Sequence, residues 1–220
     1  MTKMAARFTL AIIMAMIFSG GLAAQIPAVE RLVHGQTIVS PSLPAADLTF
    51  AKSFHPAGSQ RFSIHAVADA EQHFFVDADA RGNVRRLYWI QFEHYLPDND
   101  HRYIYPPARA IDISGMRFIA DTKLYTDYAG LTPQAGSDVE QARTLLAAKG
   151  LTLPKSAIRV RMFHAGPDNR SELMIIYLEA LPAAKLPPDA ANEAPMDDKY
   201  PVLAATVIKD AKASLKIQSR

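Results

Sequence analysis

The chain contains no cysteine, and this absence excludes several kinds of chemistry at once. Without a thiol there is no disulfide, no thiolate nucleophile, no cysteine-ligated zinc, no iron–sulfur cluster and no c-type haem attachment. The fold must therefore be held together by its apolar core. A domain of this length can bury enough apolar surface to achieve that.

Several motifs of catalysis and cofactor binding are also missing. The chain has neither a G-x-G-x-x-G fingerprint nor a phosphate-binding loop, so we predict no nucleotide or other cofactor. It has no G-x-S-x-G elbow, and Ser53 and Ser114 stand outside any such context, which disfavours a serine hydrolase. No histidine and carboxylate spacing matches a known metal motif, so we predict no metal site.

The N-terminus has the layout of a secretory signal. Lys3 and Arg7 precede the apolar run 8–18, and Ser19-Gly20-Gly21 and then Leu22-Ala23-Ala24 follow it. This order predicts a signal peptide over 1–24 and a periplasmic or secreted protein made of residues 25–220. An uncleaved membrane anchor is the alternative, but the run is shorter than the ~18 apolar residues that a spanning helix needs.

The charge of the mature chain is balanced. Two of the 24 basic residues, Lys3 and Arg7, fall in the signal, and the rest equal the 22 acidic residues in number. A neutral protein lacks the electrostatic footprint for nucleic acid, and once the signal is removed no stable membrane anchor remains. We therefore predict neither partner.

The order of the periodic segments predicts one α+β domain. We expect a largely antiparallel, twisted sheet, built from a meander and a C-terminal hairpin and covered by two helices. The segment 25–46 reads as an extended lead-in, with an edge strand near 36–39. The expected strands are 48–55, 60–68, 71–78, 84–96, 157–164 and 172–180, with one or two short strands in 110–120, and the expected helices are 137–149 and 201–217.

The helix at 137–149 has the clearest local signals. Ser137 followed by Glu140 forms a capping box, and Gly150 supplies a left-handed C-cap. Val139, Ala142, Leu145 and Leu146 form its apolar stripe.

The stretch 84–105 contains the only tryptophan and four of the eight tyrosines. Both faces of its strand mix apolar and polar residues, which is typical of a central strand that is covered on both sides. Because ionisable and aromatic groups are dense here, we predict a ligand site in this stretch. Its expected residues are Arg86, Tyr88, Trp89, Glu93, His94, Tyr95, His101 and Tyr103.

Two function classes fit this stretch. We favour non-catalytic binding of a small apolar or aromatic molecule, or of an envelope protein. The alternative is a hydrolase or metal-dependent enzyme that uses Glu93, His94, Asp98 and His101. Each class has a structural counterpart: aromatic residues often fill a core, and Asp and Asn often bond local backbone in turns.

Four arginines, Arg85, Arg86, Arg159 and Arg161, lie on expected strands. They fit either solvated strand edges paired with acids or a face that binds an anion. The sequence leaves both readings open.

Export is directly testable. We expect the N-terminus of the protein purified from the cell envelope to be Ala24 or Gln25, because cleavage follows Ala23 or Ala24. Edman sequencing or intact mass would measure it. A protein that still begins with Met1 or Thr2 would contradict the prediction.

Overall fold

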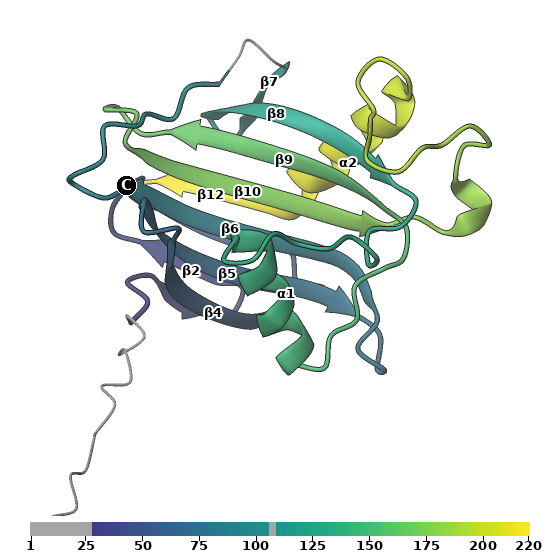
Figure 1. The fold of residues 1–220 in the computed structure, drawn as a ribbon, viewed down its shortest axis with the longest axis horizontal. Coiled ribbons are helices and arrows are strands. Elements are labelled where there is room, and N and C mark those ends of the chain that lie inside the picture. Colours follow the sequence, from purple (N-terminus) through teal and green to yellow (C-terminus); the bar gives the residue numbers. More distant parts are fainter. Residues whose placement is uncertain (1–27, 106–108) are drawn as a thin grey trace, which may run out of the picture.

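The structure, a computed structural model, describes residues 28–105 and 109–220. In this part of the chain two antiparallel sheets are combined with two α-helices (Figure 1), which confirms the predicted α+β class with its meander and C-terminal hairpin. The eight-stranded sheet contains, in spatial order, β11 (Ala194–Pro195), β8 (Met116–Tyr125), β9 (Ala157–Ala165), β10 (Ser171–Ala180), β6 (Val84–Tyr95), β5 (Ala68–Ala78) and β4 (His55–Ile64), with β7 (Arg109–Ile113) paired to β8.

A second, four-stranded sheet joins the two ends of the described chain. Its strands are β1 (Leu32–His34), β2 (Thr37–Ser40), β3 (Ala46–Phe50) and β12 (Leu215–Ser219), in that order. The expected edge strand near 36–39 is thus an inner strand, because β2 pairs with both β1 and β3.

The prediction of a final helix over 201–217 was wrong at its end. Helix α2 spans Pro201–Ser214, and the chain then pairs with β3. The physical reason is the alternation after the helix: Leu215 and Ile217 are 2% and 4% exposed, whereas Lys216 between them is exposed. That period of two fits a strand with one buried face.

The first turn of the meander also differs from the prediction. Residues 56–59, which separate the expected strands 48–55 and 60–68, belong to β4, and this strand contains a bulge between Pro56 and Gly58. An edge strand tolerates a proline and a bulge because one of its sides has no strand to pair with. The chain turns instead before β4, at residues 51–54, where the N–H of Phe54 donates to the carbonyl of Ala51 at 2.9 Å. The next turn, at His65 and Ala66 with φ values of 48° and 54°, falls within the expected strand 60–68.

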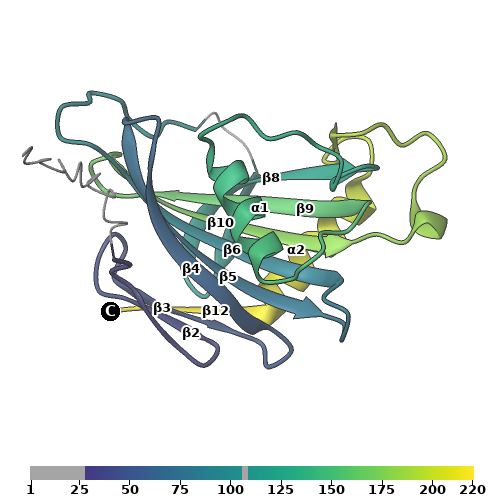
Figure 2. The ribbon, with the colours of Figure 1, turned by 60° about the horizontal axis from the view of Figure 1, so that its bottom comes forward.

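The eight-stranded sheet is covered on both faces (Figure 2). The four-stranded sheet and α2 cover one side, called here the α2 face, where they pack against Tyr88, Ile90 and Ile175. Helix α1 (Asp138–Ala148) covers part of the other side, the α1 face, where it packs near Trp89 and Ile176. The mixed pattern of β6 follows from this double cover.

The ends of α1 agree with the local signals. The Ser137 hydroxyl accepts a hydrogen bond of 3.2 Å from the N–H of Glu140. The Glu140 carboxylate accepts from the N–H of Gly136 at 2.7 Å, one residue before the expected partner. Gly150, with φ of +71°, follows the last turn as predicted.

The predicted signal peptide over 1–24 lies outside the described residues. Among residues 28–105 and 109–220, no helix combines the length and the apolar character that crossing a bilayer requires.

The packing assignment can be tested at Ile175, which is 0% exposed on the α2 face. We expect Ile175→Asp to unfold the protein, because an unpaired buried carboxylate costs several kcal/mol and total stability is only about 5–15 kcal/mol. Thermal melting followed by circular dichroism measures the effect. Val202→Asp is the matched control, since Val202 is 78% exposed, and it should melt close to the wild type. A cooperative wild-type melt of Ile175→Asp would contradict the assignment.

Candidate functional site

The residues that were predicted to bind a ligand are divided between the two faces of β6 and the loop after it. Consecutive residues of a strand point to opposite faces. Trp89 packs on the α1 face and Tyr88 on the α2 face. The α1 face therefore also holds Glu93 and Tyr95, and the α2 face also holds Arg86 and His94.

The three residues on the α2 face have partners of their own. Tyr88 is fully buried, and its hydroxyl donates to the carbonyl of Ala211 at 2.6 Å. Arg86 donates twice to one carboxylate oxygen of Asp77, at 2.5 and 3.0 Å. The Nε2 atom of His94 lies 3.9 Å from a carboxylate oxygen of Asp69. These residues lie on the far side of the sheet from Trp89.

The loop after β6 brings together four of the predicted residues. The Tyr103 hydroxyl donates to Glu93 Oε1 at 2.6 Å. The ring of Tyr95 stacks on that of Tyr103, with 4.4 Å between the centroids, and lies 5.8 Å from the ring of His101. The described part of the loop, 96–105, therefore packs against the domain.

A ladder of amide side chains crosses the α1 face and ends at Glu93. Gln60 donates to Gln72 at 2.7 Å, Gln72 to Gln91 at 2.9 Å, and Gln91 to Glu93 Oε2 at 2.7 Å. The indole N–H of Trp89 also donates to Gln91, at 3.2 Å. Burial raises the pKa of Glu93, while the bonds from Tyr103 and Gln91 oppose this rise. Each amide of the ladder is thus linked, directly or through the next amide, to the carboxylate of Glu93.

Glu172 is directly opposite Glu93 in the pairing of β10 with β6. Its side chain is 5% exposed, and burial together with the charge of Glu93 raises its pKa to about 8. A pKa of about 8 keeps the Glu172 carboxyl protonated at neutral pH. Sequence reasoning missed Glu172, because the pairing of β10 with β6 joins segments far apart in the chain.

A cavity of about 550 Å³ lies on the α1 face, beside the start of α1. Trp89, Met174 and Ile176 of the sheet line it, together with Tyr125 and Tyr128. The wall formed by the segment before α1 is held in place by Arg143. Its guanidinium donates to the carbonyls of residues 128, 129 and 131 at 2.6, 3.0 and 2.5 Å.

The charged side chains around this cavity are mainly basic. Arg159 and Arg161 share the carboxylate of Asp121, each at 2.7 Å, so that one negative charge faces two positive ones. The Nε atom of Arg159 is buried and has no hydrogen-bond partner in the described part of the chain. Lys123 also lines the cavity, and within residues 28–105 and 109–220 it forms no ion pair.

Acidic groups offset only part of this positive charge. Asp138 and Glu193 line the same cavity. Burial raises the pKa of Asp138, and its Oδ1 accepts a hydrogen bond of 2.8 Å from the N–H of Val139 at the start of α1. An anionic group beside Lys123 and Arg161 would therefore meet uncompensated positive charge.

The residues of the catalytic alternative do not form a single cluster. Glu93 and His94 point to opposite faces of β6, and Asp98 and His101 are exposed. Among the described residues no three histidine, aspartate or glutamate side chains are grouped so as to hold a metal ion.

Of the predicted ligand-binding residues, Trp89 lines the cavity of the α1 face. Arg159 and Arg161, noted in the sequence for a possible anion-binding face, line it too. Tyr125 and Tyr128 were missed, because 122–128 reads equally well as a short helix or a loop. The first part of that segment belongs to β8 instead.

Comparisons of this chain with protein-family models, with curated proteins and with solved structures found no match.

The raised pKa of Glu172 predicts how stability depends on pH. The Glu172 carboxyl has a pKa of about 8 in the folded state and of 4.5 in the unfolded chain. The free energy of unfolding therefore falls as the pH rises from about 4.5 to about 8, because the unfolded chain releases this proton first. We expect Glu172→Gln to flatten this decline, which has a limit of about 1.4 kcal/mol per pH unit. The variant should match the wild type near pH 4.5 and exceed it in stability at pH 8.5.

Urea unfolding at pH 4.5, 6.5 and 8.5 measures the effect. Glu179→Gln is the matched control, since Glu179 is on the same strand and partly exposed, and its replacement should leave the pH slope unchanged. Equal slopes for Glu172→Gln and the wild type would show that Glu172 does not retain the proton.

Proposed function

We propose that this protein binds a small molecule that has an aromatic or apolar body and an anionic group. The observation that supports this proposal is the cavity beside α1, where aromatic rings and incompletely neutralised cations line the same space. Its volume of about 550 Å³ is within the ~300–1,000 Å³ that is usual for ligand sites.

The positions of the lining groups suggest how such a ligand would lie. Its apolar body would pack on Met174, Ile176 and the ring of Tyr125, since this surface is mostly apolar. Its anionic group would face Lys123 and Arg161. Both are on the strands next to the cavity, and neither is fully buried.

Binding without catalysis fits the geometry better than the enzyme alternative does. A hydrolytic or metal centre built from Glu93, His94, Asp98 and His101 needs these groups around one substrate. The divergence of Glu93 and His94 to opposite faces argues against such a centre. The N-terminal sequence supports a periplasmic or secreted place of action.

The proposal predicts selectivity for charge. We expect naphthalene-2-sulfonate to bind the mature protein at least ~10-fold more tightly than uncharged naphthalene-2-methanol, because a charge-assisted hydrogen bond contributes about 1.5–3 kcal/mol. Lys123→Gln should remove most of this difference. Isothermal titration calorimetry measures both affinities.

Lys209→Gln is the control, since it removes an exposed lysine on α2 and should leave both affinities unchanged. Equal binding of the two compounds, or sulfonate binding that Lys123→Gln does not weaken, would contradict the proposal. If neither compound binds or shifts the melting temperature, a protein partner in the cell envelope becomes the better proposal.

A further inference from the structure

Three side chains on the α2 face form a hydrogen-bonded chain from β4 to β5. The Ser59 hydroxyl lies 2.7 Å from Nδ1 of His73, and Nε2 of His73 lies 2.7 Å from Oε1 of Glu71. Ser59 and His73 are directly opposite in the pairing of the two strands. His73 is 0% exposed and Glu71 3%, whereas Ser59 is only half-buried.

The surroundings of Glu71 determine the direction of these bonds. Its carboxylate also accepts from the backbone N–H groups of Glu30 and Arg31 at 2.8 and 2.9 Å, and from the Arg31 guanidinium at 3.1 Å. Burial alone would raise the pKa of Glu71, but the bonds from His73 and the two N–H groups lower it to about 2. Glu71 is therefore an ionised acceptor, and Nε2 of His73 must carry the hydrogen.

In a neutral imidazole whose Nε2 carries the hydrogen, Nδ1 has a free lone pair. When His73 is neutral, its Nδ1 therefore accepts the hydrogen of the Ser59 hydroxyl. A serine, a histidine base and a carboxylate that orients the base are the parts of a catalytic triad, which is recognised by geometry and not by sequence position. Here Nδ1 faces the serine and Nε2 faces the carboxylate, which reverses the common arrangement of the two ring nitrogens. One nitrogen still faces the serine as the base, and the other still donates to the carboxylate.

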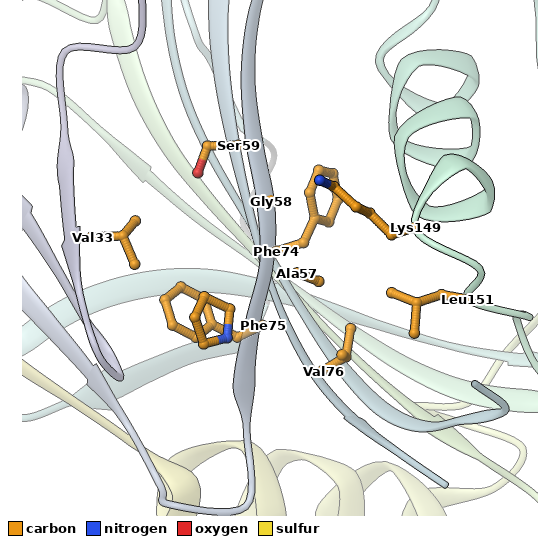
Figure 3. Close-up of a pocket in the computed structure, with 10 residues that line it drawn as sticks. Val33, Ala57, Gly58, Ser59, Phe74, Phe75, Val76, Lys149 and Leu151 are labelled. Carbon is orange, nitrogen blue, oxygen red and sulfur yellow. The ribbon is translucent and has the colours of Figure 1, made fainter. Parts of the chain in front are cut away.

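The Ser59 side chain lines a hollow beside the edge strand β4. A space of about 580 Å³ runs around β4 and is lined by Ser59, Val33 and Phe75, among others. Figure 3 shows these three side chains on one side of β4, with Lys149 and Leu151 on the other side. The part of the hollow next to Ser59 is therefore apolar.

We propose that Ser59, His73 and Glu71 form a hydrolytic site for carboxylic esters with a small apolar acyl group. The site lies on the sheet face opposite the proposed ligand cavity, so either proposal can fail without the other. This proposal departs from the expectation drawn from the sequence, which disfavoured a serine hydrolase because the chain has no G-x-S-x-G elbow. Triads on unrelated folds are recognised by their geometry and not by such a motif.

The chemistry balances with water as the second reactant. The Ser59 oxygen attacks the ester carbonyl while its proton moves to Nδ1 of His73. The carbon–oxygen bond to the alcohol breaks, and the alcohol leaves with that proton. Water then attacks the acyl-serine, giving one proton to His73, and the carboxylic acid leaves as the Ser59 hydroxyl is restored with that proton.

The negative charge on the attacked oxygen needs hydrogen-bond donors. Among the described residues no strand pairs with the outer side of β4, so alternate backbone N–H groups along this strand face away from β5. Such N–H groups beside the nucleophile serve as an oxyanion hole in acyl transfer.

A fluorophosphonate probe tests this site, because it forms a covalent adduct only with an activated serine. We expect the folded mature protein to gain one adduct, located at Ser59 by tandem mass spectrometry. The wild type should also hydrolyse p-nitrophenyl acetate at least ~100-fold faster than Ser59→Ala, the lower end of what general acid–base catalysis contributes.

Ser63→Ala is the matched control, since Ser63 is an exposed serine on the same face of β4, and it should label and hydrolyse like the wild type. The wild type unfolded in urea should not label, which tests whether labelling needs the folded arrangement around Ser59 without a buried substitution. No adduct, an adduct elsewhere, or ester hydrolysis equal to that of Ser59→Ala would overturn the proposal.

Discussion

The rest of the structure depends on the need to cover both faces of the strand pair β6–β10. Ile175 and Ile176 are neighbours on β10 that point in opposite directions, yet they are 0% and 6% exposed. A sheet that is apolar on both faces is stable only between two layers. The four-stranded sheet with α2 forms one layer, and α1 forms the other. To build the first layer, the N-terminal strands β1, β2 and β3 have to pair with the last strand, β12.

The proposed ligand cavity lies where this cover is incomplete. On the α1 face the short helix leaves the ends of β8 and β9 open, so that basic and aromatic side chains border a cavity there. On the other face, the carboxylate of Glu71 is buried beneath the chain that leads into β1 and must be fully hydrogen-bonded. Those bonds fix His73 and leave its second nitrogen to Ser59.

Signals carried by neighbouring residues could be read from the sequence, whereas pairings between distant segments could not. The caps of α1 and the hairpin β9–β10 need only local information, and both were predicted. Leu215 and Lys216 continued the helical pattern of α2, and their strand partner β3 is too far away in the chain for the local pattern to reveal it. The same limit hid the opposition of Glu172 and Glu93, and of His73 and Ser59, since strand register decides both.

The central claim is that a ligand occupies the cavity beside α1, and the side chain of Trp89 reports on it directly. As the chain has one tryptophan, its indole N–H gives one resolved signal in a ¹H–¹⁵N correlation spectrum. During titration with naphthalene-2-sulfonate, this signal and the amides of 137–139 should shift most, because they border the cavity. Shifts confined to the loop 96–105 or to the α2 face, with the indole signal unmoved, would contradict the claim.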